Sequence, residues 1–233
     1  SAGICASGLA RLGVDVTLCA RVGDDLFGRE TLRLLQANGV DTDEVAVVDA
    51  AATGLSVILS APEDRAILTL GGAMAELTAE DVAAAAERTG ARHVHVASFF
   101  LLPRMASGLP EVLRALRERG VSTSLDTNWD PAEQWAGVAE CLPHVDVLLP
   151  NAAEAIALAG ACGSPASAAE SAARALAAHG PIVVVKDGAA GGFAVDGSDL
   201  VRAAPPAVDV VDTTGAGDSF DAGFLAAWTT GLP

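Results

Sequence analysis

The residues with the clearest potential for chemistry lie near the end of the chain, in a loop that contains Gly215 and Gly217. The short apolar run at residues 208–211 predicts a strand, and apolar residues at helical spacing over residues 221–228 predict a helix. The glycines therefore fall on a strand-to-helix turn. Unpaired backbone N–H groups and the positive end of the helix dipole make such a turn an anion site, and glycine lets a phosphate approach it closely.

Asp218 follows this loop and falls in the first turn of the expected helix. A carboxylate there commonly caps the helix or complements its dipole, and the local sequence alone favours that structural role. Beside a bound phosphoryl group, however, a fixed negative charge repels the ligand unless it accepts the proton of an attacking hydroxyl. The loop thus makes Asp218 a candidate general base for phosphoryl transfer.

Two other glycine-rich nucleotide motifs do not match this loop. A dinucleotide-binding fingerprint requires a third glycine, and Phe220 stands in its place. A phosphate-binding P-loop requires Gly-Lys followed by Ser or Thr, but Lys186, the single lysine of the chain, is followed by Asp187. Both interpretations are disfavoured, and an oxidoreductase with a nucleotide cofactor remains only a distant alternative.

Three segments occur in the order typical of one enzyme family. Residues 212–220 resemble the C-terminal signature of the PfkB/ribokinase family of carbohydrate kinases, with the acid, the threonines, the glycines and the aromatic residue in place. Residues 21–28 resemble the N-terminal signature of that family, and residues 186–191 resemble its Lys-x-Gly-x-x-Gly turn. The resemblance covers nearly the whole chain. It implies an ATP-dependent carbohydrate kinase with an α/β fold, built on a doubly wound, mostly parallel sheet with a small β lid.

The composition disfavours several kinds of partner. The chain has 233 residues, enough to bury a sizeable core, and a formal net charge of −16 without a run of basic residues. This charge argues against nucleic acid and anionic membranes as partners, and no apolar stretch is long enough to span a bilayer. The cysteines lack metal-type and redox-pair spacing, so we interpret them as reduced thiols of a cytoplasmic protein. They are Cys5, Cys19, Cys141 and Cys162.

The first part of the chain predicts a helix over residues 1–12 and a strand over residues 14–20. The first signature then leads into a helix over residues 30–37, for which Asp24 or Asp25 is the expected cap. Both acids are explained by this structural role.

Regular alternation of strand and helix patterns begins at Thr78, which forms a near capping box with Asp81. Such alternation predicts parallel strands covered by helices on both faces. The expected helices span residues 79–87, 110–119 and 165–178, the segment 131–141 joins two strands, and the expected strands span residues 93–97, 121–125, 145–149 and 182–185.

Three short β-type runs predict a small antiparallel excursion with a turn at residues 62–64. The resemblance implies that this excursion is a lid that excludes water and forms a contact in a homodimer. We expect residues 1–233 to form one domain with the lid inside residues 45–70. The family has a strand upstream and helices downstream, so the chain looks truncated at both ends. The three runs are residues 45–48, 55–60 and 66–70.

Two residue pairs are candidate metal ligands. Asn151 and Glu154 follow a predicted strand, and their spacing fits either a helix cap with Glu154 reaching back or a site for Mg²⁺ held through its waters. The resembling family has a corresponding Asn-x-x-Glu element. His93 and His95 share one face of a predicted strand, but no third ligand is evident, so we interpret them as buried, hydrogen-bonded histidines.

A second turn is a candidate nucleotide site. Gly188 and Gly191 allow a tight turn close to a ligand, and Lys186 is placed to face phosphate oxygens, although a surface lysine before a hairpin is an equal alternative. The resemblance assigns this turn to ATP. It also implies a monovalent cation such as K⁺ near Asp212 and Thr214.

The acceptor site is less defined. Asp126 and Asn128 follow a predicted strand and are candidates to bind sugar hydroxyls, although such residues are also ordinary in loops. Some relatives carry an arginine where Asp130 stands, so this departure argues for a neutral substrate. The family often has an asparagine at the position of Ile4, which indicates either a different mode of sugar binding or a substrate with an apolar part.

The resulting expectation is phosphorylation of a hydroxymethyl group on a neutral, ribose- or fructose-like sugar by ATP and Mg²⁺. Asp218 is the expected base, the N–H groups of Gly215, Ala216 and Gly217 hold the developing charge, and Lys186 assists. A nucleoside kinase of the adenosine type and a non-catalytic sugar- or nucleotide-binding module are the alternatives.

Overall fold

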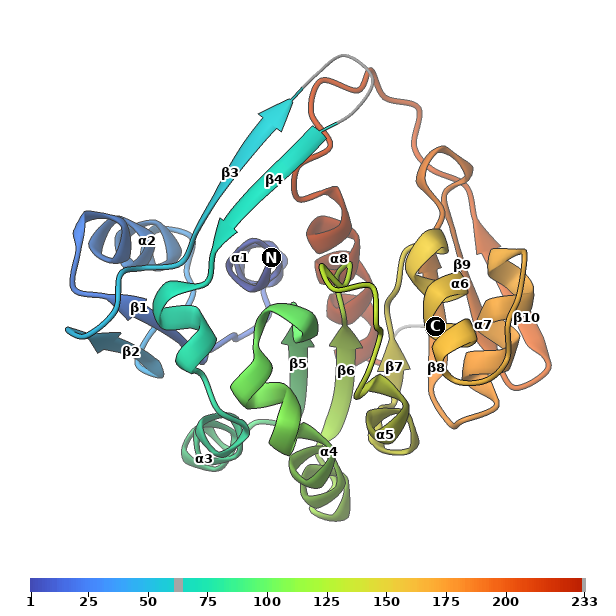
Figure 1. Ribbon diagram of the computed structural model, residues 1–233, viewed down its shortest axis with the longest axis horizontal. Helices are drawn as coiled ribbons and strands as arrows, with labels where there is room; N and C mark the ends of the chain where they lie inside the picture. The colour runs from blue at the N-terminus through green and yellow to red at the C-terminus, as the bar shows by residue number, and fades with distance from the viewer. Residues whose placement is uncertain (61–64, 232–233) are drawn as a thin grey trace.

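The computed structural model describes residues 1–60 and 65–231, and these residues form a main sheet of six strands in the order β10-β9-β8-β7-β6-β5 (Figure 1). The strands from β5 to β8 are parallel, and β9 and β10 are antiparallel additions at one edge. The predicted α/β class with a mostly parallel sheet is confirmed. The strands are β5 (His93–Ala97), β6 (Ser122–Asp126), β7 (Val147–Leu148), β8 (Ile182–Lys186), β9 (Gly192–Asp196) and β10 (Asp199–Ala203).

Helices cover both faces of this sheet, as the alternation of patterns predicts. Because successive side chains of a strand point to opposite faces, neighbouring residues of β7 enter different cores. Val147 packs with residues of the first and last helices, whereas Leu148 packs in the larger core on the other face. None of the helices in the described ranges is long and apolar enough to cross a membrane. The longer helices are α1 (Ala2–Arg11), α2 (Leu26–Ala37), α3 (Ala79–Thr89), α4 (Pro103–Glu118), α6 (Ala152–Ala161), α7 (Ala169–Ala177) and α8 (Ala216–Thr229).

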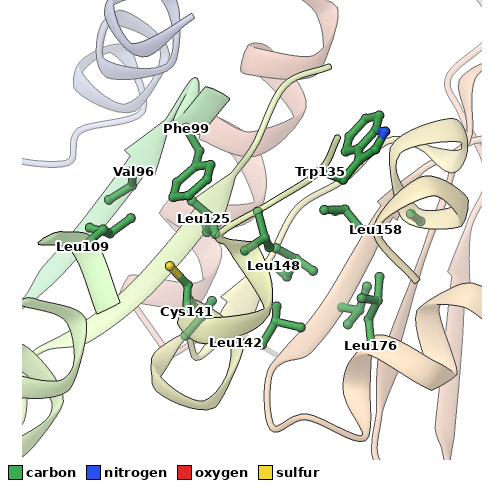
Figure 2. Packing of buried hydrophobic residues seen from close by; sticks show 14 of the residues in the cluster. Val96, Phe99, Leu109, Leu125, Trp135, Cys141, Leu142, Leu148, Leu158 and Leu176 are labelled. Atoms are coloured by element: carbon green, nitrogen blue, oxygen red, sulfur yellow. The ribbon is translucent and has the colours of Figure 1, made fainter. Parts of the chain in front are cut away.

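The larger core lies between the sheet and the helices α4, α6 and α7. Figure 2 shows Leu109 of α4, Leu125 of β6, Leu158 of α6 and Leu176 of α7 converging on Leu148, and all five side chains are fully buried. Burial of a leucine side chain contributes about 1.5–3 kcal/mol. This core fixes the sheet, and with it the strand ends that carry the polar residues discussed below.

The excursion between the first signature and α3 is divided between two small sheets. β3 (Leu55–Ser60) and β4 (Arg65–Leu70) form an antiparallel hairpin that projects from the rest of the molecule (Figure 1). β2 (Val45–Val48) instead pairs in parallel with β1 (Ala20–Gly23). Our prediction that all three runs form one antiparallel unit is therefore wrong for β2. The helix α2 lies between β1 and β2 and supplies the crossover that a parallel pair requires.

The hairpin carries apolar side chains that remain exposed. Val57, Leu59, Leu68 and Leu70 share one face of it, and each is exposed by between 46% and 63%. A two-stranded hairpin is at best marginally stable by itself, and an exposed apolar face of this kind is typical of interaction surfaces. The predicted turn at residues 62–64 lies outside the described residues.

Two predicted strands differ from the structure. Residues 208–211 form no strand, and Val208, Val210 and Val211 are largely exposed. Residues 14–20 make one isolated bridge, from Thr17 to Asp41, before β1 begins. Residues 208–211 lack the partner and the buried face that a strand requires, whereas residues 14–19 pack Val14, Val16 and Leu18 against the core but pair only briefly, at Asp41.

Several helix bounds also differ from our predictions. The helix expected from Pro110 begins at Pro103, because Pro103 takes the first-turn position that proline favours, and Pro110 lies inside α4. Within residues 131–141 the structure has only the short helix α5 (Val138–Cys141), and α7 begins at Ala169. The predicted capping box at the start of α3 is confirmed, and of the two acids proposed to cap α2 the structure uses Asp25.

A partly buried polar stripe runs along one face of β5 and β6. The ring nitrogens of His93 lie 2.8 Å from Ser122 Oγ and Ser124 Oγ, and Nδ1 of His95 also lies 2.8 Å from Ser124 Oγ. Asp126 ends the stripe on the same face, as its pairing with Ala97 requires. The predicted hydrogen bonds of both histidines are confirmed, except that Nε2 of His95 has no partner among the described residues, and both residues are half-buried.

These histidines make the protein sensitive to acid. Burial lowers the pKa of each histidine to about 4, and for His95 protonation would place an N–H at Nε2 where no acceptor is described. The unfolded chain binds these protons near pH 6.5, so stability is present above pH 6.5 and is lost as the pH falls toward 4. A difference of about 2.5 pH units corresponds to roughly 3 kcal/mol for each histidine.

We therefore expect His95→Gln to lose less stability than the unchanged protein as the pH falls from 6.5 to 4. Urea unfolding at several pH values measures this difference, which should reach about 3 kcal/mol for a single group. Asp221 and Glu154 also titrate abnormally, but they are common to both proteins and cancel in the comparison. His179→Gln, at an exposed position, is the control and should track the unchanged protein. Parallel stability curves for His95→Gln and the unchanged protein would contradict the prediction.

Candidate active site

The glycine loop opens directly into α8. Gly215 precedes the helix with φ at 75°, a left-handed conformation that glycine adopts without strain. Gly215 supplies no side-chain cap, and the N–H of Ala216 donates to the carbonyl oxygen of Thr213 at 3.1 Å, so among the described residues the N–H groups of Gly217 and Asp218 keep the orphan character of a helix start. Upstream, Oδ1 of Asp212 accepts hydrogen bonds from the backbone N and the Oγ1 of Thr214, both at 2.8 Å. The loop therefore has the geometry of an anion site, although no strand leads into it.

Asp218 lies in the first turn of α8 and is half-buried. Its Oδ2 lies 3.9 Å from the position that a Cβ on Gly215 would occupy, so the carboxylate is adjacent to the loop. Because the helix has no side-chain cap, capping does not explain Asp218, and of the two structural roles only a complement to the helix dipole remains.

Three charged side chains from three different elements meet beneath this turn. Nζ of Lys186, at the end of β8, lies 3.1 Å from Oδ2 of Asp221 and 3.4 Å from Oδ2 of Asp126. The side chain of Lys186 is 12% exposed, that of Asp126 is 6% exposed and that of Asp221 is 1% exposed. The lysine thus does not lie on the surface before the β8–β9 turn. It links the end of β6 to α8.

The charges in this cluster perturb one another. Burial lowers the pKa of Lys186, but Asp126 and Asp221 outweigh burial and raise it, so the ammonium stays charged. Burial raises the pKa of Asp221, Lys186 opposes that shift, and a hydrogen bond with Asp126 adds to it. Two buried carboxylates share one ammonium, so the group with the most buried side chain, Asp221, is the one driven toward its protonated form.

Cys5 of α1 shows that the base and the buried cluster are close together. Burial and, to a smaller extent, the negative charges of Asp221, Asp218 and Asp126 together raise the pKa of this thiol to about 12, against the opposing charge of Lys186. Cys5 lies where α1 and α8 pack together against β7 and β8, and the Cβ position of Gly217, next to Asp218, lies 3.8 Å from Nζ of Lys186. The structure therefore brings Asp218, Asp126 and Lys186 into one site.

Asn151 and Glu154 form a reciprocal capping box at the start of α6. The backbone N–H of Asn151 donates to Oε2 of Glu154 at 2.8 Å, and the N–H of Glu154 donates to Oδ1 of Asn151 at 2.9 Å. The capping interpretation is thus confirmed. Burial raises the pKa of Glu154, and Asp126 and Lys186 also act on it, so the box borders the cluster.

The donor set at this box fits Mg²⁺ held through water. The cap uses Oε2 of Glu154 and Oδ1 of Asn151, which leaves Oε1 of Glu154 as a hard oxygen ligand of the type this cation prefers. A cage of three or more acidic, histidine or cysteine ligands does not occur among the described residues. Few protein ligands and several retained waters are typical of Mg²⁺.

The turn after β8 has one glycine that the backbone itself requires. Gly191 has φ at 90°, and a Cβ there would lie 2.1 Å from the carbonyl oxygen of Ala203. Gly188 has φ at 54°, but a Cβ there would meet nothing within 4 Å. The turn therefore needs Gly191 for its own geometry, whether or not it contacts a nucleotide.

Asp126, Asn128 and Ile4, the residues considered for the acceptor, differ in burial and in the groups that they contact. Asp126 turns both oxygens inward, because Oδ1 accepts from the N–H of Asn128 at 3.2 Å and Oδ2 faces Lys186. Asn128 is half-buried, and its Nδ2 lies 3.2 Å from Oγ of Ser1. Ile4 is 43% exposed, and two of its carbons lie 3.2 Å from the Cβ position of Gly215, so an apolar side chain borders the loop.

Asp130 does not serve as a determinant of substrate charge. Its carboxylate is buried and accepts hydrogen bonds from the backbone N–H groups of Ala132, Gln134 and Trp135, at 2.7–2.9 Å. These bonds hold the loop after β6. The carboxylate faces its own loop, and no arginine stands at this position, so the expectation of a neutral substrate stays a prediction.

Asp221 is the residue of this site that sequence reasoning missed. It lies three residues after Asp218 on the same helix, within an otherwise apolar buried face that includes Ala222 and Leu225. An acid at that place, in a chain with the single lysine Lys186, was the available signal. Its partner became evident only when β8 and α8 were placed together.

Comparisons with known proteins identify the family. Residues 4–233 match the family model described as pfkB family carbohydrate kinase. A ribokinase of Mus musculus is 32% identical over 229 residues, which are 96% of this chain and 68% of that protein. An ATP-dependent ribose-1-phosphate kinase of Halopiger xanaduensis is 32% identical over 99% of this chain and 73% of its own length.

Solved structures agree with these matches. Adenosine kinase from Sinorhizobium meliloti is 26% identical, with a TM-score of 0.86 over 99% of this chain and 71% of that one. A protein assigned as ribokinase II from Escherichia coli, in complex with ATP and Mg²⁺, is 25% identical, with a TM-score of 0.85 over 99% of this chain and 75% of that one. The glycine loop, its carboxylate, the α/β sheet and these matches together place this chain in the pfkB family of carbohydrate kinases.

Proposed function

We propose that this protein transfers the γ-phosphoryl group of ATP to a hydroxymethyl group of a neutral, ribose- or fructose-like sugar. The observation that carries the proposal is the uncapped start of α8, where Gly215 opens a helix N-terminus and Asp218 stands beside it. Donors for a phosphoryl group and a base for the attacking hydroxyl are thereby within one turn of helix.

In the proposed reaction, the sugar hydroxyl gives its proton to the carboxylate of Asp218 as its oxygen attacks the γ-phosphorus. A new O–P bond forms, the bond between the γ-phosphorus and the bridging oxygen breaks, and ADP leaves. Backbone N–H groups of Gly215, Ala216 and Gly217 hold the charge that develops on the transferred group. A positioned base contributes roughly 10²–10⁴ in rate, and one donor of this kind roughly 10²–10³.

The proposed contacts to the nucleotide and the metal ions use the capping box of α6, the turn after β8 and the glycine loop. Asn151 and Glu154 would hold Mg²⁺ through its waters, and the ion would neutralise charge on the phosphates. Gly188 and Gly191 would let the backbone approach the nucleotide, and Lys186 would add positive charge from behind the loop rather than by direct contact. A K⁺ ion is proposed to bind near Asp212 and Thr214, where the backbone N–H and the hydroxyl of Thr214 donate hydrogen bonds to Oδ1 of Asp212.

The acidic surroundings support a neutral acceptor. The carboxylates of Asp126 and Asp218 border the site, and the ammonium of Lys186 already lies 3.4 Å from Oδ2 of Asp126. A phosphate or carboxylate on the acceptor would meet uncompensated negative charge there. Asn128 is the proposed contact to the sugar hydroxyls. Asp126 would orient Asn128 by accepting a hydrogen bond from the backbone N–H of Asn128.

A nucleoside is the second candidate acceptor. Ile4 offers an apolar surface beside Gly215 where a hydrogen-bonding residue was expected, and an adenosine kinase is among the similar structures. An apolar group such as a base would cover this side chain, whereas a simple sugar would leave it exposed.

We also propose that the protein forms a homodimer and works in the cytoplasm. The exposed apolar face of the β3–β4 hairpin, with Val57 and Leu68 opposite one another, is the surface proposed to close over the site and to meet a second copy in a homodimer. The cysteines of the described residues are unpaired, which suits the reducing cytoplasm. Neither nucleic acid nor a membrane is proposed as a partner.

The proposal is tested by measuring ADP release from MgATP with D-ribose, D-fructose, adenosine and ribose 1-phosphate as acceptors. We expect one neutral acceptor to be turned over at least tenfold faster than ribose 1-phosphate. Preference for the phosphorylated sugar would overturn the neutral-acceptor proposal. Binding of acceptor and nucleotide without ADP release would instead identify a non-catalytic binding module.

A further inference from the structure

The ion pairs beneath α8 are not required by the proposed chemistry and have an energetic cost. Asp221 is almost completely buried, and its Oδ1 has no hydrogen-bond partner among the described residues. Replacement of a buried ion pair by apolar residues is often neutral or stabilising, so a buried ion pair is weak evidence for a stabilising role. The better-attested use of such a pair is to select one arrangement of the elements that it joins.

The pairs join the parts of the site that must be aligned. Asp126 ends β6, where the loop with Asn128 begins, and Lys186 ends β8. Asp221 is one turn beyond Asp218 on α8, so both lie on the same side of that helix. We call the loop with Asn128 the acceptor loop. It is connected to the helix that carries Asp218 through the two contacts of Lys186, one with Asp126 and one with Asp221.

This connection lies close to the glycine loop. A Cβ on Gly217 would lie 3.8 Å from both Cδ and Nζ of Lys186, so the lysine passes directly under the first turn of α8. The remaining contacts of α8 with the sheet are apolar, through Ala222 and Leu225. Apolar packing is non-directional and permits small shifts of a helix, whereas an ammonium held by two carboxylates fixes a position.

From these contacts we infer that Asp221 is a positioning residue, which acts through Lys186 and Asp126 to fix α8, and thereby Gly217 and Asp218, relative to the acceptor loop. The inference rests on the proposed role of Asp218 as the base. Asp221 does not touch the acceptor or the phosphoryl group. Its effect is on the alignment of the residues that do.

The test compares Asp221→Leu, which removes the polar contact, with Asp221→Asn, whose amide can still accept from Lys186 and donate to Asp126. We expect Asp221→Leu to lower kcat at least tenfold with the KM for MgATP within about twofold of its original value. Asp221→Asn should restore kcat to within about fivefold. Asp199→Asn, at an exposed position on β10, is the matched control and should behave as the unchanged protein.

A second readout does not depend on turnover. Hydrogen exchange of the backbone N–H groups of residues 216–221, measured without ligands, should be faster in Asp221→Leu and unchanged in Asp221→Asn. Asp218→Asn should leave this exchange unchanged, so the positioning role and the base are tested separately. Full turnover in Asp218→Asn would overturn the proposed base, whereas unchanged exchange and kcat in Asp221→Leu would overturn the positioning role alone.

Folding defects are also decisive. If Asp221→Leu does not fold, Lys186→Gln carries the same expectation for exchange alone, because it removes the ammonium shared by both contacts but also removes the positive charge proposed to act on the phosphates. Failure of both variants to fold would assign the cluster to stability and overturn the inference. A loss of kcat in Asp221→Leu that Asp221→Asn does not rescue would also overturn it, since the lost charge rather than position would then be responsible.

Discussion

Asp218→Asn should lower kcat at least a hundredfold while the KM for MgATP changes little. The amide keeps the size of the carboxylate but cannot accept the proton of the attacking hydroxyl, and a positioned base is worth roughly 10²–10⁴ in rate. ADP release under saturating MgATP, with the acceptor that the protein turns over fastest, measures the effect. Because Asp218 is half-buried and caps no helix, the substitution should leave the fold intact.

The alternative explanation of Asp218 gives a different result. If the carboxylate only complements the helix dipole, Asp218→Asn should cost about 0.3–1 kcal/mol of stability and leave kcat unchanged. Urea unfolding of the same variant separates the two cases. Asp199→Asn is again the control, because it removes an exposed carboxylate on β10 that lies outside the site.

Gly191→Ala should destabilise the protein by more than about 3 kcal/mol, the largest effect on stability that we expect from removing a glycine in the site. Its φ of 90° is unfavourable for alanine, and the added Cβ would lie 2.1 Å from the carbonyl oxygen of Ala203 and 2.9 Å from the backbone N of Pro205. These are backbone atoms, so the clash cannot be relieved by rotating a side chain. Urea unfolding is the measurement.

Gly188→Ala is the matched comparison in the same turn. Gly188 also has a positive φ, of 54°, but a Cβ there would meet nothing within 4 Å, so the cost is limited to about 1–2 kcal/mol for the backbone conformation. Equal stability of the two variants would contradict the structural requirement at Gly191. A Gly191→Ala protein that is stable but has a raised KM for MgATP would show that the glycine serves the nucleotide instead.

Local sequence signals predicted the elements whose causes are themselves local. The capping box of Thr78 and Asp81 and the cap at Asp25 form with residues at most a few positions away, and both occur as expected. The parallel sheet also followed from the alternation of strand and helix patterns, since each amphipathic helix must cover a strand. The strand expected at residues 208–211 failed because a strand depends on a distant partner that local composition does not reveal.

The candidate site divides in the same way. The sequence by itself determined the glycine loop, Asp218 and the Asn151–Glu154 box, because each is a short motif at the start of a helix where orphan N–H groups dictate the chemistry. Only the tertiary structure decided that Lys186 is buried, that its partners are Asp126 and Asp221, and that Asp130 serves its own loop. The charges in this cluster span 95 residues of the chain, from position 126 to position 221, so their meeting depends on how β6, β8 and α8 pack.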